Sequence, residues 1–159
     1  MAAFTVREAA DADGRAMAEL YAAVAAERTG IATEPPVDVG ERAAHFARTA
    51  GGSVVAVADG GQLVGLIHVE ASRHGFGDLG MLVHRDWRGR GVGSALLRET
   101  IVRARGAGLH KLCLEVFAHN EAGIALYRKA GFVEEGRRPG QYRRASGELW
   151  DAIIMGLPL

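Results

Sequence analysis

Several features are scarce or absent in this chain of 159 residues, and each absence excludes a class of protein. The only cysteine is Cys113, so an internal disulfide is impossible, which fits a reducing compartment. No apolar run approaches the ~20 residues that cross a bilayer, and the N-terminus lacks a secretory pattern. The six histidines show no paired ligand spacing, so no metal site is expected. The sequence therefore predicts a cytoplasmic protein.

The chain also lacks net charge, because 19 basic residues balance 19 acidic ones. A general nucleic-acid binder normally carries a large positive excess, so this class is disfavoured. The charges are unevenly placed: residues 1–84 hold 6 basic and 11 acidic side chains, whereas residues 85–159 hold 13 basic and 8 acidic ones. A basic second half suits a compact anionic ligand. The apolar fraction of 48% and the length indicate one globular domain over residues 1–159.

Hydrophobic periodicity predicts a mixed α/β domain around a central sheet, in the order β-α-α-β-β-β-α-β-α-β-β. Strands are expected over residues 4–8, 53–58, 62–71, 78–83, 111–117, 132–135 and 149–157. Helices are expected from Asp11 or Asp13 to Arg28, and over residues 41–49, 94–105 and 120–130. Asp59-Gly60-Gly61 predicts a hairpin between the second and third strands.

Glycine, in contrast, is abundant, and three glycines alternate in one segment between an expected strand and an expected helix. The segment is Arg88-Gly89-Arg90-Gly91-Val92-Gly93-Ser94. Glycines let the backbone approach a ligand closely and tolerate a positive φ. Free N–H groups at the start of the following helix, aided by its dipole, then form an anion site. Arg85, Arg88 and Arg90 would add positive charge to this site, and Ser94 a hydroxyl.

Two better-known phosphate motifs and a glycine-rich loop without a ligand are the alternatives. A P-loop ends in Gly-Lys-Ser/Thr, and the segment has no lysine, so that motif is excluded. A Rossmann fingerprint is closer, because Glu115 lies about 20 residues on, where a ribose-binding acid belongs. However, the spacing is Gly-x-Gly-x-Gly, and the stretch from His84 to Arg88 separates the strand from the first glycine. A dinucleotide site is therefore the weaker interpretation.

A second group of candidate residues spans the strand at 111–117 and the helix after it. Alternation in the strand places Glu115 on one face with Cys113 and Phe117. A carboxylate is unfavourable beside apolar residues unless it has a partner or a function. Glu115 is thus either a general base or a paired structural carboxylate. Asn120 is expected to cap the helix, which alone could explain its identity. Tyr127 follows two turns later, either as a core residue or as part of a site.

These residues together resemble the GCN5-related N-acetyltransferases (the GNAT family). The acyl-CoA loop of that family, Arg/Gln-x-x-Gly-x-Gly/Ala, is matched by Arg88, Gly91 and Gly93. The segment from Asn120 to Phe132 is similar to the second motif of the family, in which a tyrosine precedes a Gly-Phe turn. The expected element order also agrees, so the resemblance covers essentially the whole chain. It implies a three-layer fold with a central, mixed, mostly antiparallel sheet flanked by helices.

The resemblance also implies how acetyl-CoA is bound. Backbone groups of Met81, Leu82 and Val83 would pair with the pantetheine arm, and an N–H near Val83 would polarise the thioester carbonyl. The pyrophosphate would be held by backbone N–H groups of six consecutive residues: Gly89, Arg90, Gly91, Val92, Gly93 and Ser94. Asn120 would bind near the pantetheine, and Tyr127 would lie close to the sulfur.

The implied reaction is transfer of an acetyl group from acetyl-CoA to a primary amine, by direct attack in a ternary complex. Glu115 would accept the amine proton, directly or through water, with Asp78 in reserve, and Tyr127 would protonate the departing thiolate. A small amino-acid-like acceptor is favoured, because no recognition domain is appended. A protein N-terminus, as in ribosomal-protein N-terminal acetyltransferases, is an alternative. So is a non-catalytic acyl-CoA-binding module, which the Glu115–Tyr127 pair disfavours.

Two further expectations concern the last quarter of the chain. The apolar run from Glu148 to Met155 predicts a terminal strand with an exposed, aggregation-prone edge, and from it we predict a homodimer. A basic run without nearby acids predicts a solvated loop, with recognition of an acidic substrate or of the CoA 3′-phosphate as the alternative. This basic run consists of Arg137, Arg138, Arg143 and Arg144.

Overall fold

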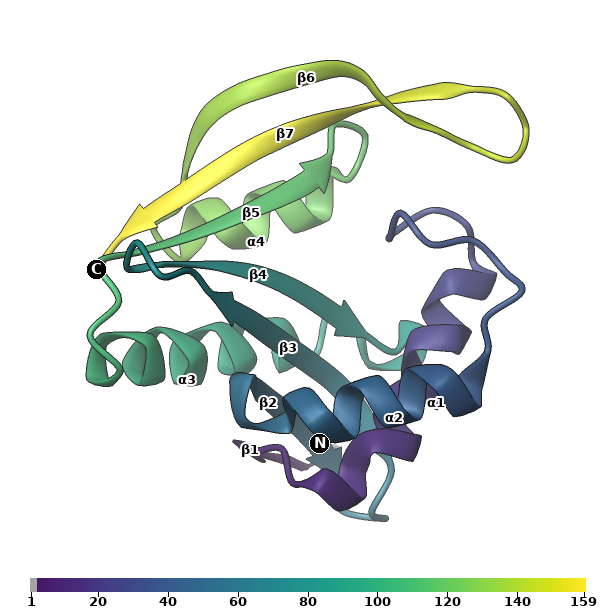
Figure 1. Cartoon of the computed structure of the whole chain (residues 1–159), viewed down its shortest axis with the longest axis vertical. Helices are drawn as coiled ribbons and strands as arrows, with labels where there is room; N and C mark the ends of the chain where they lie inside the picture. The colour runs from purple at the N-terminus through teal and green to yellow at the C-terminus, as the bar shows by residue number, and fades with distance from the viewer. Residues whose placement is uncertain (1–2) are drawn as a thin grey trace.

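The computed structural model describes residues 3–159, and its helices and strands follow the predicted order (Figure 1). The elements are β1 (Phe4–Glu8), α1 (Gly14–Ala26), α2 (Val39–Thr49), β2 (Ser53–Ala58), β3 (Leu63–Ala71), β4 (Phe76–Val83), α3 (Val92–Gly106), β5 (Lys111–Phe117), α4 (Glu121–Lys129), β6 (Val133–Arg143) and β7 (Leu149–Pro158). Apart from the much longer β6, the predicted ranges hold closely. Within the described residues, no helix is long and apolar enough to cross a membrane.

All seven strands belong to one sheet, in the order β1-β2-β3-β4-β5-β7-β6. Neighbouring strands are antiparallel except for β4 and β5, which are parallel and are joined through α3. A parallel pair needs such a crossover connection. The mixed, mostly antiparallel sheet expected from the resemblance is confirmed, and it differs from the all-parallel sheet of a Rossmann domain.

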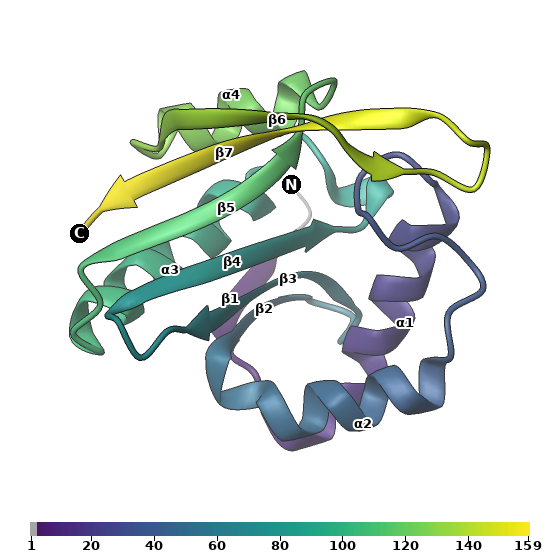
Figure 2. The same cartoon turned by 45° about the horizontal axis from the view of Figure 1, so that its top comes forward.

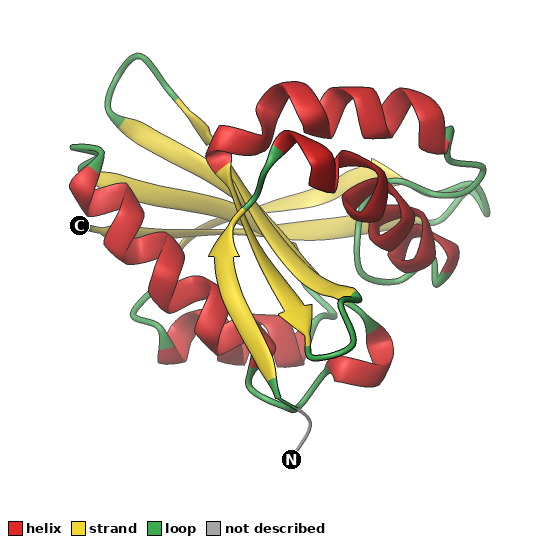
Figure 3. Cartoon of the chain, turned by 90° about the horizontal axis from the view of Figure 1, so that it is seen from below, coloured by secondary structure: helices red, strands yellow, loops and turns green. Residues whose placement is uncertain are grey.

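Helices cover both faces of the sheet, so the fold has three layers (Figure 3). Along β2, Val54 and Ala56 belong to the core beneath α3 and α4, whereas Val55 belongs to the core beneath α1 and α2. Successive side chains of a strand point to opposite faces. The apolar run in β2 is therefore explained by burial on both faces.

The sheet opens between its two parallel strands. The β4–β5 pairing is limited to Phe76–Asp78 opposite Lys111–Cys113, although both strands continue beyond it. The rest of β5 stays paired with β7 as far as Phe117. Figures 1 and 2 show the two strands diverging toward their C-terminal ends. The second half of β4 thus has one backbone edge without a neighbouring strand.

The basic run near the C-terminus does not form the solvated loop that was predicted. Arg137 and Arg138 lie in β6, where Arg137 pairs with Asp151 at 2.6 Å and Arg138 pairs with Glu115 at 3.2 Å. The Arg144 side chain is only 3% exposed. The prediction was wrong because the acids that pair with these arginines are distant in sequence and are brought near only by strand pairing.

The position of β7 also differs from the prediction. This apolar strand was expected at an exposed edge, but it lies between β5 and β6 and is paired on both sides. The outer edge belongs instead to the charged β6. Charged edge strands resist unwanted pairing with other chains. The aggregation hazard from which the homodimer was predicted is therefore absent.

Candidate active site

The open edge of β4 presents alternate backbone groups to the gap beside β5. The Ser72 N–H donates to the carbonyl of Phe76, and the His84 N–H donates to the carbonyl of Val64. The N–H and C=O groups of even-numbered β4 residues therefore face β3, and those of odd-numbered residues face β5. Met81 and Val83 thus face the gap. Leu82, which was expected to pair in the same way, faces β3 with its backbone.

A pocket lies where β4 and β5 diverge, and it brings together the candidate residues of three elements. Its lining includes Met81 of β4, Glu115 of β5, Asn120 at the N-cap of α4 and Tyr127 in the last turn of α4. The remaining wall, which was not predicted from the sequence, includes residues 30–32 of the α1–α2 connection and Tyr142 of β6. No local pattern distinguishes those residues, because they reach the pocket only through tertiary packing.

Glu115 is both paired and part of the pocket lining. Its carboxylate accepts hydrogen bonds from Arg138 Nη1 at 3.2 Å and from the Tyr142 hydroxyl at 3.4 Å, and 33% of its side chain is exposed. Burial, followed by the Glu115 charge, raises the pKa of Tyr142, so this hydroxyl stays protonated and donates. The expected paired carboxylate is thus present, and the same group faces the pocket.

Tyr127 is buried in the α4 side of the core and also lines the pocket. Its ring packs edge-on against Phe132, with centroids 5.7 Å apart. Burial raises the pKa of Tyr127 to about 12. The hydroxyl is therefore fully protonated at neutral pH, as a proton donor must be.

Asn120 is the N-cap of α4, as the sequence predicted. Its Oδ1 accepts a hydrogen bond from the N–H of Gly123 at 3.0 Å. A Cβ at Gly123 would lie 2.7 Å from Asn120 Nδ2, so glycine leaves room for the capping side chain. The cap fixes the start of α4 and hence the position of Tyr127 two turns later.

The glycine-rich loop has the geometry of an anion site. Gly89 and Gly91 have φ values of 72° and 85°, and Gly91 is the N-cap of α3 without a side-chain capping bond. The first N–H groups of a helix have no intrahelical acceptor, so those at the start of α3 are available to a ligand. A Cβ at Gly93 would lie 2.7 Å from Leu126, which shows how closely this helix start packs against α4 beside the pocket.

The arginines of this loop make contacts that the sequence did not indicate. Arg88 forms a two-bond ion pair with Glu27, both bonds at 2.8 Å, and its Nε donates to the Val83 carbonyl at 3.0 Å. Arg90 lies over the ring of Trp87. Arg88 therefore anchors the loop to the end of β4 and to Glu27 at the end of α1.

One other sequence candidate, the reserve base Asp78, lies apart from the pocket lining. Asp78 is exposed and sits at the last paired position of β4, opposite Cys113 of β5. Burial raises the pKa of the Cys113 thiol, which keeps it protonated and poorly nucleophilic. Across residues 3–159 there is no group of three or more His, Cys, Asp or Glu side chains that could hold a metal ion.

Comparison with known proteins agrees with this architecture. A sequence profile described as the acetyltransferase (GNAT) family matches residues 15–132. The L-methionine sulfoximine/L-methionine sulfone acetyltransferase of Pseudomonas paraeruginosa is 33% identical, over 98% of this chain and 94% of that protein. The ribosomal protein bS18-alanine N-acetyltransferase of Escherichia coli is 36% identical, over 76% of this chain and 74% of that protein.

Solved structures match over the whole fold. The phosphinothricin acetyltransferase from Sinorhizobium meliloti, in complex with AcCoA, superposes with a TM-score of 0.88 at 26% identity, covering 98% of this chain and 88% of that one. The profile match covers most of the chain and includes the glycine-rich loop and α4. The chain therefore belongs to the acetyltransferase (GNAT) family and is an N-acetyltransferase that uses acetyl-CoA.

Proposed function

We propose that this enzyme acetylates the primary amine of a small, amino-acid-like acceptor by direct attack in a ternary complex. The observation that carries the proposal is that Glu115 and Tyr127 line one pocket at the opening between β4 and β5. A proton acceptor and a proton donor are thus available at the place where the sheet offers a free backbone edge. The Pseudomonas paraeruginosa relative, which matches 98% of this chain, is named for amino-acid-like substrates.

The residues present fit acetyl-CoA. The gap-facing N–H and C=O of Met81 and the N–H of Val83 suit an extended chain with amide groups, such as pantetheine, which can bind in the manner of an added strand. The N–H groups from Gly89 to Ser94 suit its pyrophosphate. Bound acetyl-CoA supplies the thioester that the acceptor amine attacks.

The remaining chemistry consists of proton transfers and charge stabilisation by this chain. Glu115 accepts a proton from the ammonium form of the acceptor, directly or through water, and Arg138 and Tyr142 hold its carboxylate in place. The N–H of Val83 donates toward the carbonyl oxygen as negative charge develops there. Tyr127 donates a proton to the sulfur as the C–S bond breaks, and the second proton that the nitrogen loses on becoming an amide restores the Tyr127 hydroxyl.

The walls of the pocket favour a small acceptor over a polypeptide. The Ala145 N–H, in the β6–β7 connection, donates to Glu34 Oε2 at 2.7 Å, and Arg144 donates to the carbonyl of Ala32 at 2.8 Å. These contacts join the β6–β7 connection to the α1–α2 connection beside the pocket. A protein N-terminus would need an open groove for the residues that follow it.

A panel of amines tests the function. We expect thiol release from acetyl-CoA with at least one amino-acid-like amine, and weak or no release with polyamines and short peptides. Release only with peptides that begin in alanine would favour the ribosomal-protein type of substrate. Acetyl-CoA binding without release on any amine would favour a non-catalytic binding module and overturn the proposal.

The phosphate-binding role of the loop predicts that Gly91→Val weakens acetyl-CoA binding by about 10-fold or more. At a φ of 85° a β-branched residue is strained, and its Cβ would stand where the backbone meets the phosphates. Isothermal calorimetry measures the change. Gly61→Val is the matched control, because Gly61 in the β2–β3 turn also has a φ of 85° and open space around it. Unchanged affinity in Gly91→Val would rule out this role.

A homodimer stays a prediction, now without the exposed apolar edge that first suggested it. Light scattering decides the point. A single mass of 16.8 kDa across protein concentrations indicates a monomer, and twice that mass indicates a dimer.

A further inference from the structure

Arg144 is a buried cation whose role lies outside the chemistry described above. It follows directly after β6, and its side chain is 3% exposed. The guanidinium lies 4.4 Å from the centroid of the Trp150 ring and 5.4 Å from that of Phe117. A buried charge is costly unless it is well paired, so the partners of Arg144 indicate what it does.

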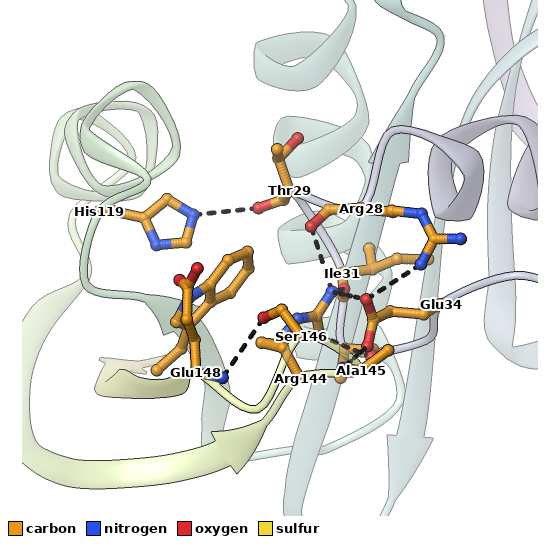
Figure 4. Close-up of polar contacts among 11 residues, drawn as sticks. Arg28, Thr29, Ile31, Glu34, His119, Arg144, Ala145, Ser146 and Glu148 are labelled. Atoms are coloured by element: carbon orange, nitrogen blue, oxygen red, sulfur yellow. Dashed lines mark hydrogen bonds and ion pairs between the residues drawn. The ribbon is translucent and has the colours of Figure 1, made fainter.

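Those partners lie in the α1–α2 connection, more than 100 positions earlier in the chain (Figure 4). Arg144 Nη1 donates to the carbonyl of Ala32 at 2.8 Å, and Nη2 donates to the carbonyls of Arg28 at 3.2 Å and Ile31 at 3.4 Å. The Glu34 carboxylate lies 3.8 Å from Nη2. One side chain thus gathers three carbonyls and a carboxylate of a single segment.

Two more contacts hold the same segment in Figure 4. The ring of His119, after β5, bonds through Nε2 to the carbonyl of Thr29 at 3.1 Å. The Ala145 N–H donates to Glu34. We call residues 28–34 the acceptor loop, because Gly30, Ile31 and Ala32 line the pocket together with Glu115 and Tyr127.

The acceptor loop has little structure of its own. Residues 27–38 form no helix or strand. Among the described residues, backbone–backbone hydrogen bonds involve none of residues 29–37. Its conformation therefore depends on side-chain contacts. Tyr21 bonds to Thr33, and Arg28 pairs with Glu34 within the loop. Arg144 makes the most contacts, with three bonds to backbone carbonyls.

We propose that Arg144 is a positioning residue that sets the shape of the acceptor half of the pocket through the acceptor loop. The inference rests on the proposed function, because it assigns this half to the amine. The half assigned to acetyl-CoA is built from β4, residues 88–94 and α4, none of which bonds to Arg144. Arg144 thus governs acceptor binding and leaves acetyl-CoA binding unaffected.

The role requires arginine and not merely a positive charge. A guanidinium is flat, stacks on aromatic rings and presents five donors in fixed directions, whereas an ammonium is a compact point charge. Lysine at position 144 would keep the charge but could not reach the three carbonyls and lie over Trp150 at once. Arg144→Lys is therefore the informative variant.

Steady-state kinetics test the proposal with an amine that the unmodified enzyme accepts. In Arg144→Lys we expect the KM for the amine to rise on the order of 10-fold, because a small displacement of the residues that line a binding site weakens binding. The calorimetric affinity for acetyl-CoA should stay the same. Arg143→Lys is the matched control, because Arg143 is adjacent but exposed. It should change neither value. An unchanged KM for the amine in folded Arg144→Lys, or equal losses for both substrates, overturns the proposal.

Hydrogen exchange provides a readout that needs no acceptor. Amides of residues 28–34 should exchange faster in Arg144→Lys than in Arg143→Lys, while the amides of β4 and β5 should not. If no amine is turned over by the unmodified enzyme, the proposed function fails but this measurement still decides whether Arg144 holds the loop. Unchanged exchange overturns the positioning role.

Glu34→Gln covers the case in which Arg144→Lys does not fold. This variant removes the charge that faces Arg144 while keeping an oxygen that can accept from Ala145. We expect the same direction of change in exchange and in the KM for the amine, but a smaller one. If both stay unchanged in folded Glu34→Gln, the acceptor loop does not depend on this cluster and the proposal is overturned.

Discussion

Glu115→Gln is expected to lower kcat/KM by about 10²- to 10⁴-fold, the range that general-base catalysis contributes. Glutamine has nearly the same shape, and its amide oxygen can still accept from Arg138 and Tyr142, so the fold and acetyl-CoA affinity should persist. It cannot take up a proton from the acceptor. Initial rates at low amine concentration, together with calorimetry on acetyl-CoA, measure the two effects.

The pH dependence separates a base from a structural carboxylate. The free base must be ionised to accept a proton, so the acidic limb of the kcat/KM profile should change in Glu115→Gln. An amine with a pKa near 10 adds a rise of its own, so the profile must be compared across amines of different basicity. If Glu115→Gln keeps both its rate and its acidic limb, the base lies elsewhere, and Asp78→Asn is the next variant.

Arg138→Gln is the matched control for Glu115. It breaks the same ion pair from the other side but leaves the carboxylate in place. If Glu115 serves only to hold Arg138, the two variants should lose similar activity. If Glu115 is the base, the loss in Arg138→Gln should be much smaller.

The parts of the site that could be predicted are those whose local structure is determined by residues close together in the sequence. The strand Lys111–Phe117 follows from its alternation, and Asn120 from its capping chemistry. The loop around Gly91 follows from a backbone conformation that glycine tolerates best. In each case the local structure depends on residues within a few positions of one another. Residue types and their spacing are therefore enough to predict it.

The parts that could not be predicted depend on contacts between distant segments. Arg138 and Glu115 are 23 residues apart, and Arg144 and Ala32 are 112 residues apart. The residues next to these arginines in the sequence therefore do not indicate their carboxylate or carbonyl partners. The length of β6 was missed for a related reason. β6 is a charged strand at the edge of the sheet and pairs with β7. It lacks the alternation of apolar and polar residues that would predict a strand.

The arginines also show why charge alone predicts function poorly. Arg88 occupies the first position of the family's loop motif, yet its guanidinium is bound to Glu27 and to the Val83 carbonyl. The motif predicts a role for Arg88 in binding acetyl-CoA, and the structure adds two contacts that the sequence did not indicate. Arg88 fixes the loop to the end of β4 and to Glu27, and we propose that backbone N–H groups bind the anion.

Tyr127→Phe is expected to lower kcat on the order of 10²-fold while leaving acetyl-CoA affinity nearly intact. Phenylalanine keeps the ring that packs against Phe132, so only the hydroxyl is lost. With a pKa of about 12, that hydroxyl carries its proton throughout the neutral range, and it is a weaker acid than an exposed tyrosine. The loss should sit at the low end for proton transfer, because a thiol with a pKa near 8.5 is already a fair leaving group.

Turnover at saturation with both substrates, paired with calorimetry on acetyl-CoA, tests the role of Tyr127. Tyr142→Phe is the control, because it removes another hydroxyl from the same pocket, one that bonds to Glu115 and is not the proposed acid. We expect its kcat to fall far less than that of Tyr127→Phe. If Tyr127→Phe instead loses acetyl-CoA binding and keeps its turnover at saturation, Tyr127 is a packing residue of the α4 core. The proton for the thiolate then comes from solvent, which the opening between β4 and β5 would have to admit.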